Sequence, residues 1–224
     1  TGTTDNISVV LNAEPSSDVV ISVTSSDTGE VTASPATLTF TAADWDIAKT
    51  VTLTGANDDL VDGSQTSTIT LSVVDGSSDD DFDGVADQTV SVTTTDSDVA
   101  GFTVIESGGT TTVAEDGSTT DDFTVVLDAQ PISDVVISVT SSDTGEATVS
   151  PATLTFTSGN WDSSQTVTVT GVDDSLIDGS QTSTITIAVE DESSNDSFDS
   201  LSAQTVAVSP AEEDTAGVTL TLSA

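Results

Sequence analysis

The sequence repeats itself without a gap after 116 positions, and this period constrains the fold more than any other feature. The stretch VVISVTSSDTGE at Val19–Glu30 returns unchanged at Val135–Glu146, and DGSQTSTIT at Asp62–Thr70 returns at Asp178–Thr186. Identity over such stretches indicates that both copies adopt one fold. The 224 residues therefore predict two domains, each long enough to bury its own apolar core.

Both copies contain short runs of alternating apolar and polar residues, rich in Val, Ile and Thr and separated by Asp, Gly, Ser and Pro. This alternation predicts β-strands, and no segment has helical periodicity with caps. Seven short strands in about 110 residues predict two tandem immunoglobulin-like Greek-key β-sandwiches, an all-β fold. In the second copy, strands A to G are expected at 102–113 (interrupted at 107–109), 123–127, 135–140, 153–157, 166–170, 182–189 and 204–209, and in the first copy strands B to G are expected at 7–11, 19–24, 37–41, 50–54, 66–73 and 88–93.

The 116-residue register also predicts where each domain begins and ends. We expect the first sandwich at 1–99, the second at 100–215, and the start of a further strand at 216–224. Thr1 aligns with Gly117, so strand A of the first copy would precede Thr1. Two interpretations stay open: an excerpt from a longer array, or a polymer subunit whose strand Val218–Leu222 completes the first sandwich of the next molecule.

The charge balance excludes several function classes. The chain has 39 acidic residues against one cation, Lys49, and a formal net charge of −38. Nucleic acids and anionic membranes are bound through Lys and Arg, so neither is an expected partner. No segment approaches the roughly 20 apolar residues of a membrane span. Because His, Cys and Arg are absent, only paired carboxylates could perform acid–base chemistry, and we expect no enzyme.

Strand order predicts where the acids gather. Successive antiparallel strands deliver their loops to alternate ends of a sandwich, so the A–B, C–D and E–F loops share one end with the chain that leaves strand G. Two carboxylates about 5 Å apart repel by roughly 3 kcal/mol at an effective dielectric near 20, which predicts a bound cation. An all-oxygen ligand set favours Ca²⁺. The acids at this end are Glu115, Asp116, Asp143, Glu146, Asp173, Asp174, Asp178, Glu212, Glu213 and Asp214 in the second copy, and Asp27, Glu30, Asp58, Asp59, Asp62, Asp96 and Asp98 in the first.

The stretch LTFTSGNWDSSQTVTVTGVDDSLIDGSQTSTITIAVED and its counterpart from Leu38 to Asp75 resemble the Calx-β repeats of large bacterial surface adhesins of the RTX type. The resemblance covers both copies. It implies Ca²⁺ at one end, held by a glutamate of the first loop, by acids of the C–D and E–F loops and by linker acids. Asp59 is replaced by Ser175 in the second copy, so the two sites should differ. The implied ligands are Glu115, Asp143, Asp174, Asp178 and Asp214 in the second copy, and Asp27, Asp58, Asp62, Asp96 and Asp98 in the first, where Asp59 is a further candidate.

A second candidate lies at the opposite end, in the F–G loop of the first copy. Asp79, Asp81 and Asp83 match D-x-D-x-D-G, but the twelfth position is Val90 rather than Glu, so the loop is not an EF-hand. A solvated acidic loop is the alternative interpretation. The counterpart loop at 195–200 has lost two of the carboxylates.

Together these features predict a calcium-stiffened structural module of an extracellular, cell-surface adhesin or fibre. Its partners would be neighbouring repeats or identical subunits joined head to tail. The alternatives are a filament subunit that polymerises by donor-strand exchange and a module that binds glycan or protein. The chain has no Tyr and only two Trp, which leaves few residues to stack on sugars. Trp45 and Trp161 are instead expected to close one end of each core.

Overall fold

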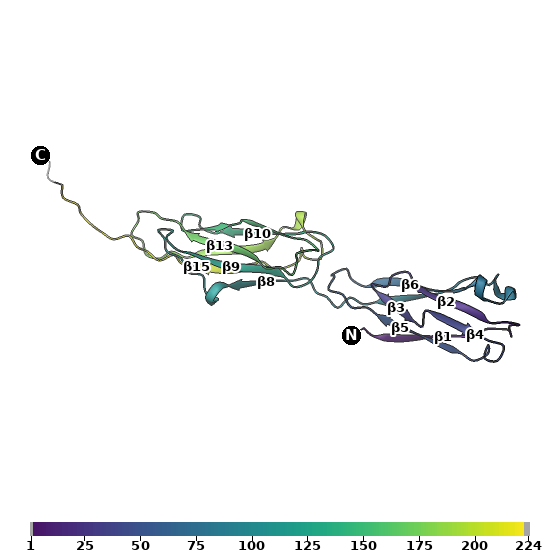
Figure 1. The fold of residues 1–224 in the computed structure, drawn as a ribbon. Helices are drawn as coiled ribbons and strands as arrows, with labels where there is room; N and C mark the ends of the chain where they lie inside the picture. Colours follow the sequence, from purple (N-terminus) through teal and green to yellow (C-terminus); the bar gives the residue numbers. More distant parts are fainter. Residues whose placement is uncertain (1, 222–224) are drawn as a thin grey trace. The chain divides into compact units, whose positions relative to one another are not determined.

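The computed structural model describes residues 2–221, and the chain divides into two compact units, unit 1 at Thr1–Ser97 and unit 2 at Asp98–Ala224. Each unit is a β-sandwich, and the described helical segments are short 3₁₀ turns (Figure 1). The prediction of an all-β chain of tandem sandwiches is therefore confirmed. The end of the predicted strand Val218–Leu222 lies outside the described residues.

Unit 1 consists of a three-stranded and a four-stranded antiparallel sheet. The strand orders are β1-β5-β3 and β4-β2-β6-β7. Two 3₁₀ turns, η1 (Asp75–Ser77) and η2 (Asp80–Phe82), lie between β6 and β7. The strands are β1 (Thr4–Val9), β2 (Val19–Ser25), β3 (Val31–Ser34), β4 (Thr37–Phe40), β5 (Lys49–Gly55), β6 (Gln65–Val73) and β7 (Gln88–Thr94).

Unit 2 has the same arrangement with one strand more. Its sheets have the orders β11-β13-β9-β8 and β12-β10-β14-β15. The added strand β8 pairs with the edge of β9, and no strand among the described residues of unit 1 pairs with the corresponding edge of β1. The elements are β8 (Phe102–Glu106), η3 (Ser107–Gly109), β9 (Thr120–Leu127), β10 (Val135–Ser141), β11 (Ala147–Ser150), β12 (Thr153–Phe156), β13 (Gln165–Gly171), β14 (Ser183–Val189), η4 (Asp191–Ser193) and β15 (Gln204–Val208).

Strands β3 and β11 were not predicted. The sequence analysis treated the segment between predicted strands C and D as a single loop, but the structure places a strand there that pairs with β5 or β13. After Ser34 or Ser150 the chain crosses at a Ser-Pro step to the other sheet, where β4 or β12 pairs with β2 or β10. A four-residue strand ended by proline carries too little alternation to be recognised.

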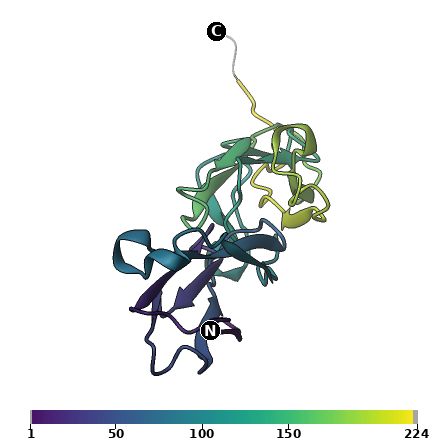
Figure 2. The same cartoon turned by 90° about the vertical axis from the view of Figure 1, so that its right-hand side faces the viewer.

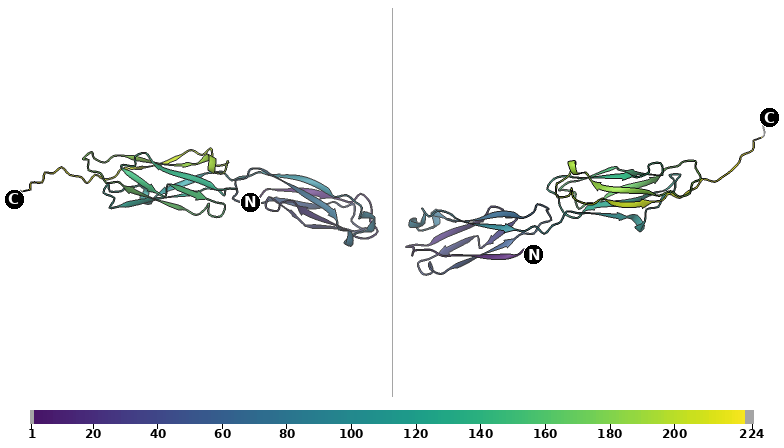
Figure 3. Two further views of the ribbon diagram at one scale, coloured as in Figure 1. Left: turned by 90° about the horizontal axis from the view of Figure 1, so that it is seen from above. Right: turned by 180° about the vertical axis from the view of Figure 1, so that it is seen from behind.

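Alternating residues of the two sheets fill the space between them. In unit 2, Phe123, Phe156, Ile137, Ile185 and Ile187 are fully buried. Figure 2, which looks roughly along the strands, and Figure 3 show the sheets of each unit packed face to face. Threonines occupy many of the intervening outward positions, where β-branched residues suit a pleated sheet.

The prediction that strand A is interrupted is also confirmed. β8 ends at the η3 turn, where Gly108 and Gly109 adopt positive φ angles of 62° and 81° that favour glycine. Beyond the turn the chain no longer pairs with β9. It instead forms parallel bridges from Thr111 to Val208 and from Ala114 to Ala211. Strand A thus moves from one sheet to the other and ends beside the chain that leaves β15.

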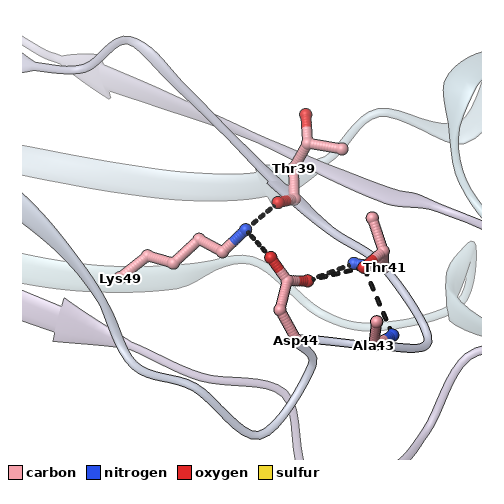
Figure 4. Close-up of polar contacts among 5 residues, drawn as sticks. All are labelled: Thr39, Thr41, Ala43, Asp44 and Lys49. Carbon is pink, nitrogen blue, oxygen red and sulfur yellow. Dashed lines mark hydrogen bonds and ion pairs between the residues drawn. The ribbon is translucent and has the colours of Figure 1, made fainter.

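The single cation of the chain has a structural role at the β4–β5 connection of unit 1 (Figure 4). Lys49 Nζ lies 2.7 Å from Asp44 Oδ2, donates to the Thr39 carbonyl and lies 4.7 Å from the centre of the Phe40 ring. The ammonium group and the hydrogen bonds from Thr41 lower the pKa of Asp44 to about 2. Trp45, in the same connection, packs against the apolar core of unit 1, as predicted.

In unit 2, neutral residues replace both members of this ion pair. Asn160 replaces Asp44 and accepts hydrogen bonds from the Thr157 amide and hydroxyl at 2.6 and 3.0 Å. Gln165 replaces Lys49 and donates to the Thr155 carbonyl at 2.8 Å. Asn160 and Gln165 thus keep the threonine hydrogen bonds that Asp44 and Lys49 form in unit 1, so the connection does not require the ion pair.

Candidate metal centre

The path of strand A places Glu115 at the end of the unit 2 sandwich. The Ala211 amide donates to the Val113 carbonyl at 3.0 Å, and the Glu115 amide donates to the Ala211 carbonyl at 3.2 Å. This short parallel ladder brings the first loop of the unit against the chain that leaves β15. Residues separated by about 100 positions are therefore neighbours here.

Three carboxylates from three separate loops meet at this point. One oxygen each of Glu115, Asp174 and Asp214 lies within 4.8 Å of the other two. Glu115 is only 5% exposed, whereas Asp174 and Asp214 are half-buried. Among residues 2–221, this is the only group of three or more acids found with metal-ligand spacing. The three carboxylates thus come from the loop before β9, the β13–β14 loop and the segment that follows β15.

Glu212 holds this arrangement together, although it was not among the predicted ligands. Its Oε2 accepts hydrogen bonds from the amides of Asp178 and Gly179 at 3.1 and 3.0 Å, and its Oε1 accepts one from Asp214 at 2.7 Å. Asp96 occupies the same place in unit 1, where its Oδ2 accepts from Asp62 and Gly63 at 3.2 and 2.9 Å. The 116-residue register aligns Asp96 with Glu212, so the sequence already paired these two acids as counterparts.

The electrostatics at this end are unfavourable without a cation. Burial raises the pKa of Glu115 above its ordinary value of 4.5, and the charges of Glu212, Asp174 and Glu213 raise it further. Burial also raises the pKa of Glu146, with further contributions from Asp178, Asp143, Asp174 and Glu212. The cluster is therefore a region of negative potential in which ionising every carboxylate costs free energy.

The raised pKa values predict the pH dependence of unit 2 in the absence of metal. A carboxyl whose pKa is raised by folding stabilises the folded state while protonated, and this contribution is lost as the pH rises through the raised pKa. In EDTA, we expect the melting temperature of unit 2 to fall between about pH 4.5 and neutral pH. Thermal unfolding followed by Trp161 fluorescence in a Trp45→Phe background would measure this slope.

Glu115→Gln should flatten that slope, because it removes the buried titrating group while keeping its size. Glu192→Gln is the matched control, since Glu192 is an exposed residue of η4, at the opposite end of the sandwich. A slope that is the same in both variants would show that the Glu115 carboxyl does not control the pH dependence.

The structure places the other predicted unit 2 ligands nearby but with different partners. Asp143 is exposed, and its Oδ1 accepts a hydrogen bond from the Gly145 amide at 2.9 Å. Asp178 is exposed and is held through its backbone amide by Glu212. Both carboxylates contribute to the raised pKa of Glu146, so they belong to the same acidic end. The structure does not bring them into the three-carboxylate group.

In unit 1 the predicted ligands are distributed over the corresponding turns. Asp27 Oδ1 accepts from the Gly29 amide at 2.9 Å and Asp58 Oδ1 from the Leu60 amide at 3.1 Å, while Asp96 binds the backbone of Asp62. No three-carboxylate group was found among the described residues of this unit. The position that corresponds to Glu115 would precede Thr1. Two further predicted ligands are Asp59, which is exposed in the β5–β6 loop, and Asp98, which falls in unit 2.

The second candidate metal site lies in the β6–β7 loop of unit 1, and its first acid, Asp79, is bound by neighbouring protein groups. Asp79 is 4% exposed, and its carboxylate accepts hydrogen bonds from Ser16 Oγ and from the amides of Ser16, Ser17 and Asp81 at 2.7 to 3.0 Å. The Ser16 hydroxyl and these amides lower the pKa of Asp79 to about 2.

The counterpart of Asp79 in unit 2 is Asn195, which is also buried and forms similar contacts to Ser133 and Ser197. Asp81 and Asp83 are exposed. Partial desolvation by its neighbours raises the pKa of Asp83, and the charges of Asp75, Asp80 and Asp79 raise it further. Asp79 therefore anchors this loop to the β1–β2 connection, and ion binding by the loop stays a prediction.

The donor set of the three-carboxylate group suits a hard divalent cation. Its ligand atoms are all carboxylate oxygens, and the chain has no His or Cys that would favour zinc or copper. Ca²⁺ tolerates irregular coordination by six to eight oxygens, whereas Mg²⁺ demands near-ideal octahedral geometry. Glu115, Asp174 and Asp214 would supply the first ligands, and the ion would neutralise charges that otherwise raise the pKa of Glu115.

Comparisons with known proteins give neither a family nor a curated relative. No protein-family model matches the chain, and no curated protein matches it. No helix of the described residues is long and apolar enough to cross a membrane.

Among solved structures, the chain is similar to the surface layer protein SbsC (19% identity, TM-score 0.39, covering 85% of this chain and 20% of that one). It is also similar to invasin, a bacterial integrin-binding protein (17% identity, TM-score 0.40, covering 94% and 36%). A third similar structure is the calcium binding domain CBD12 of CALX1.1 (13% identity, TM-score 0.31, covering 84% and 73%). The chain spans only a fifth of the SbsC chain, and similarity at this level assigns no function.

Proposed function

We propose that this chain is a structural spacer of an extracellular, cell-surface fibre or adhesin, and that Ca²⁺ bound where the chain leaves each sandwich stiffens it. The observation that carries the proposal is the position of Glu115. A carboxylate that is 5% exposed lies beside Asp174 and Asp214, and burial together with the charges of Glu212, Asp174 and Glu213 raises its pKa. A divalent cation would convert this repulsion into attraction between three loops.

The stiffening follows from which segments supply the ligands. Glu115 and Asp174 belong to loops of the sandwich, whereas Asp214 lies in the segment that follows β15. An ion held by all three would fix the direction in which the chain leaves the unit. The corresponding exit from unit 1 carries Asp96, already bound to the β5–β6 loop, and Asp98 two residues later.

The rest of the surface is compatible with an extended fibre. The net charge of −38 makes neighbouring chains repel one another and keeps them from clumping laterally. Stability without any disulfide would come from the two apolar cores and from bound ions.

Replacing both Asp96 and Asp98 with Asn should loosen the connection between the units more than it destabilises either sandwich. The two apolar cores are untouched, so both melting temperatures should change little. Small-angle X-ray scattering in Ca²⁺ and in EDTA is the measurement. We expect Ca²⁺ to lengthen and stiffen the wild-type chain but not the variant.

The matched control is the double substitution of Asp191 and Asp196 with Asn, which removes the same charge from exposed positions away from the linker. An Asp96/Asp98 variant that stiffens in Ca²⁺ as the wild type does would remove these acids from the mechanism.

A further inference from the structure

The chain enters unit 2 at one end of the sandwich and leaves it at the other (Figure 1). β8 begins at Phe102, opposite Leu127 at the end of β9, and Gln204 at the start of β15 donates to the Phe102 carbonyl at 2.6 Å. Strand A and β15 therefore start together and run in the same direction. Tension along the chain would pull these two neighbours in opposite directions, strand A toward its start and β15 toward its end.

The segment Thr111–Glu115, called the crossover segment below, is the part of strand A that contacts β15 and the chain after it. Parallel bridges join Thr111 to Val208 and Ala114 to Ala211. Because the two chains are parallel and would be pulled in opposite directions, tension acts on all of their contacts at once. Contacts loaded in this way must break together, whereas strands pulled apart from one end lose them one after another. Resistance to force depends on the rate of unfolding, which such a geometry lowers.

The crossover segment is well packed on the side of β15. Val113 accepts a hydrogen bond from the Ala211 amide at 3.0 Å, and the Glu115 amide donates to the Ala211 carbonyl at 3.2 Å. Thr111, Val113 and Glu115 are each at most 5% exposed, so alternate side chains of the segment are buried. Sliding the segment along β15 would therefore break backbone hydrogen bonds and expose three buried side chains together.

Asp121, in β9, fastens the opposite edge of the crossover segment. Its Oδ2 accepts a hydrogen bond from the Thr112 amide at 2.9 Å, and its Oδ1 accepts from the Ser107 hydroxyl and from the Asp122 amide. The Ser107 hydroxyl, followed by the amides of Thr112 and Asp122, lowers the pKa of Asp121 below its ordinary value of 3.8. One carboxylate thus ties η3 and the crossover segment to β9, across the step at which strand A leaves its first sheet.

We propose that the crossover segment is a mechanical clamp, which together with Asp121 keeps unit 2 folded when the chain is pulled from its two sides. This inference deepens the proposed function and rests on it, because a spacer in a surface fibre is exposed to tension. To the stiffness proposed above it adds resistance to unfolding.

The clamp consists of protein contacts and does not require an ion. Glu115 ends the crossover segment and Asp214 follows β15, so Ca²⁺ held by both would add one connection between the same two chains. Pulling in EDTA therefore tests the clamp alone, and the change on adding Ca²⁺ tests the metal centre separately. A slow unfolding in EDTA that depends on Asp121 supports the clamp whether or not Ca²⁺ slows it further.

Single-molecule force spectroscopy of the 224-residue chain in EDTA tests the proposal through the direction of pulling. The chain has no cysteine, so introduced cysteines can carry the handles. Handles at Val99→Cys and Thr215→Cys pull strand A and β15 past one another. Handles at Val99→Cys and Ser193→Cys, the latter in η4, pull at one end of the sandwich and separate the strands from there. Unit 1 is outside both pairs and is not pulled.

At equal force, we expect unit 2 to unfold at least about tenfold more slowly with the first pair of handles than with the second. Equal rates from the two pairs would overturn the proposal. This comparison leaves the clamp unchanged in sequence, so it decides the proposal without any substitution that endangers folding.

A substitution then locates the resistance within unit 2. With handles at 99 and 215, Asp121→Ala removes the acceptor of three hydrogen bonds and should speed unfolding at constant force by about tenfold or more. Asn160→Ala is the matched control, because it removes the acceptor of two hydrogen bonds in the β12–β13 connection, outside the pulled strands, and should change the rate far less. An Asp121→Ala protein whose rate changes no more than that of the control would also overturn the proposal.

Discussion

Free Ca²⁺ at about a hundredfold above its dissociation constant is expected to stabilise unit 2 by about 2.7 kcal/mol, which corresponds to roughly 10 °C or more in melting temperature. Only the folded unit brings Glu115, Asp174 and Asp214 together, so binding is linked to folding. Thermal unfolding followed by Trp161 fluorescence, in EDTA and in Ca²⁺, is the measurement.

Glu115→Gln should melt below the wild type in Ca²⁺ but not in EDTA. The variant loses most of the stabilisation by Ca²⁺, because one of the three carboxylates is gone. In EDTA it should melt at a temperature equal to or above that of the wild type, because the buried charge that Glu212 and Asp174 oppose is also gone. Glu192→Gln should behave as the wild type in both conditions. A Glu115→Gln protein that responds fully to Ca²⁺ would place the ion elsewhere.

Gly171→Ala is expected to destabilise unit 2 and to weaken its calcium binding, whereas Gly55→Ala should leave unit 1 nearly unchanged. The two glycines are counterparts at the ends of β13 and β5. A methyl group on Gly171 would lie 2.0 Å from the Ala114 carbonyl oxygen and 3.1 Å from Glu115 Cα. On Gly55 the nearest atoms, which include the Thr3 carbonyl oxygen, would be at an ordinary 3.7 Å.

The overlap at Gly171 is with the backbone of Ala114, which cannot move without displacing the loop that carries Glu115. We expect a loss of about 1 to 3 kcal/mol in unit 2, or roughly 5 °C or more in its melting temperature. Thermal unfolding of each variant, with Trp45 reporting on unit 1 and Trp161 on unit 2, measures the contrast. Equal effects of the two substitutions would mean that the close approach at Ala114 does not constrain the loop.

The sequence could predict the sandwich architecture because its signals are local and occur twice. Alternation in segments such as 135–140 and 166–170 identifies strands that the structure contains, and the glycines at 108 and 109 mark the interruption of strand A. Strands β3 and β11 escaped because four residues ended by proline do not establish a period. Missing these two strands did not change which loops were predicted to share one end of the sandwich. The reason is that β12 begins directly after β11, with only the Ser-Pro step between the two sheets.

The candidate site was predictable in its composition but not in its inner arrangement. Strand order alone brings Glu115, Asp174 and Asp214 to one end, and the structure places their oxygens together. Which acids accept backbone hydrogen bonds depends on loop conformation, so the role of Glu212 was not predicted. The contacts of Asp79 with Ser16 depend likewise on a long-range loop contact that carries no sequence pattern.

An anomalous difference map from crystals of the 224-residue chain grown in Ca²⁺ tests the central claim most directly. The account predicts a peak at about 2.3 to 2.6 Å from oxygens of Glu115, Asp174 and Asp214, which is absent from crystals of the Glu115→Gln variant. A map with no peak at these three carboxylates, although Ca²⁺ is present in the crystal, would contradict it.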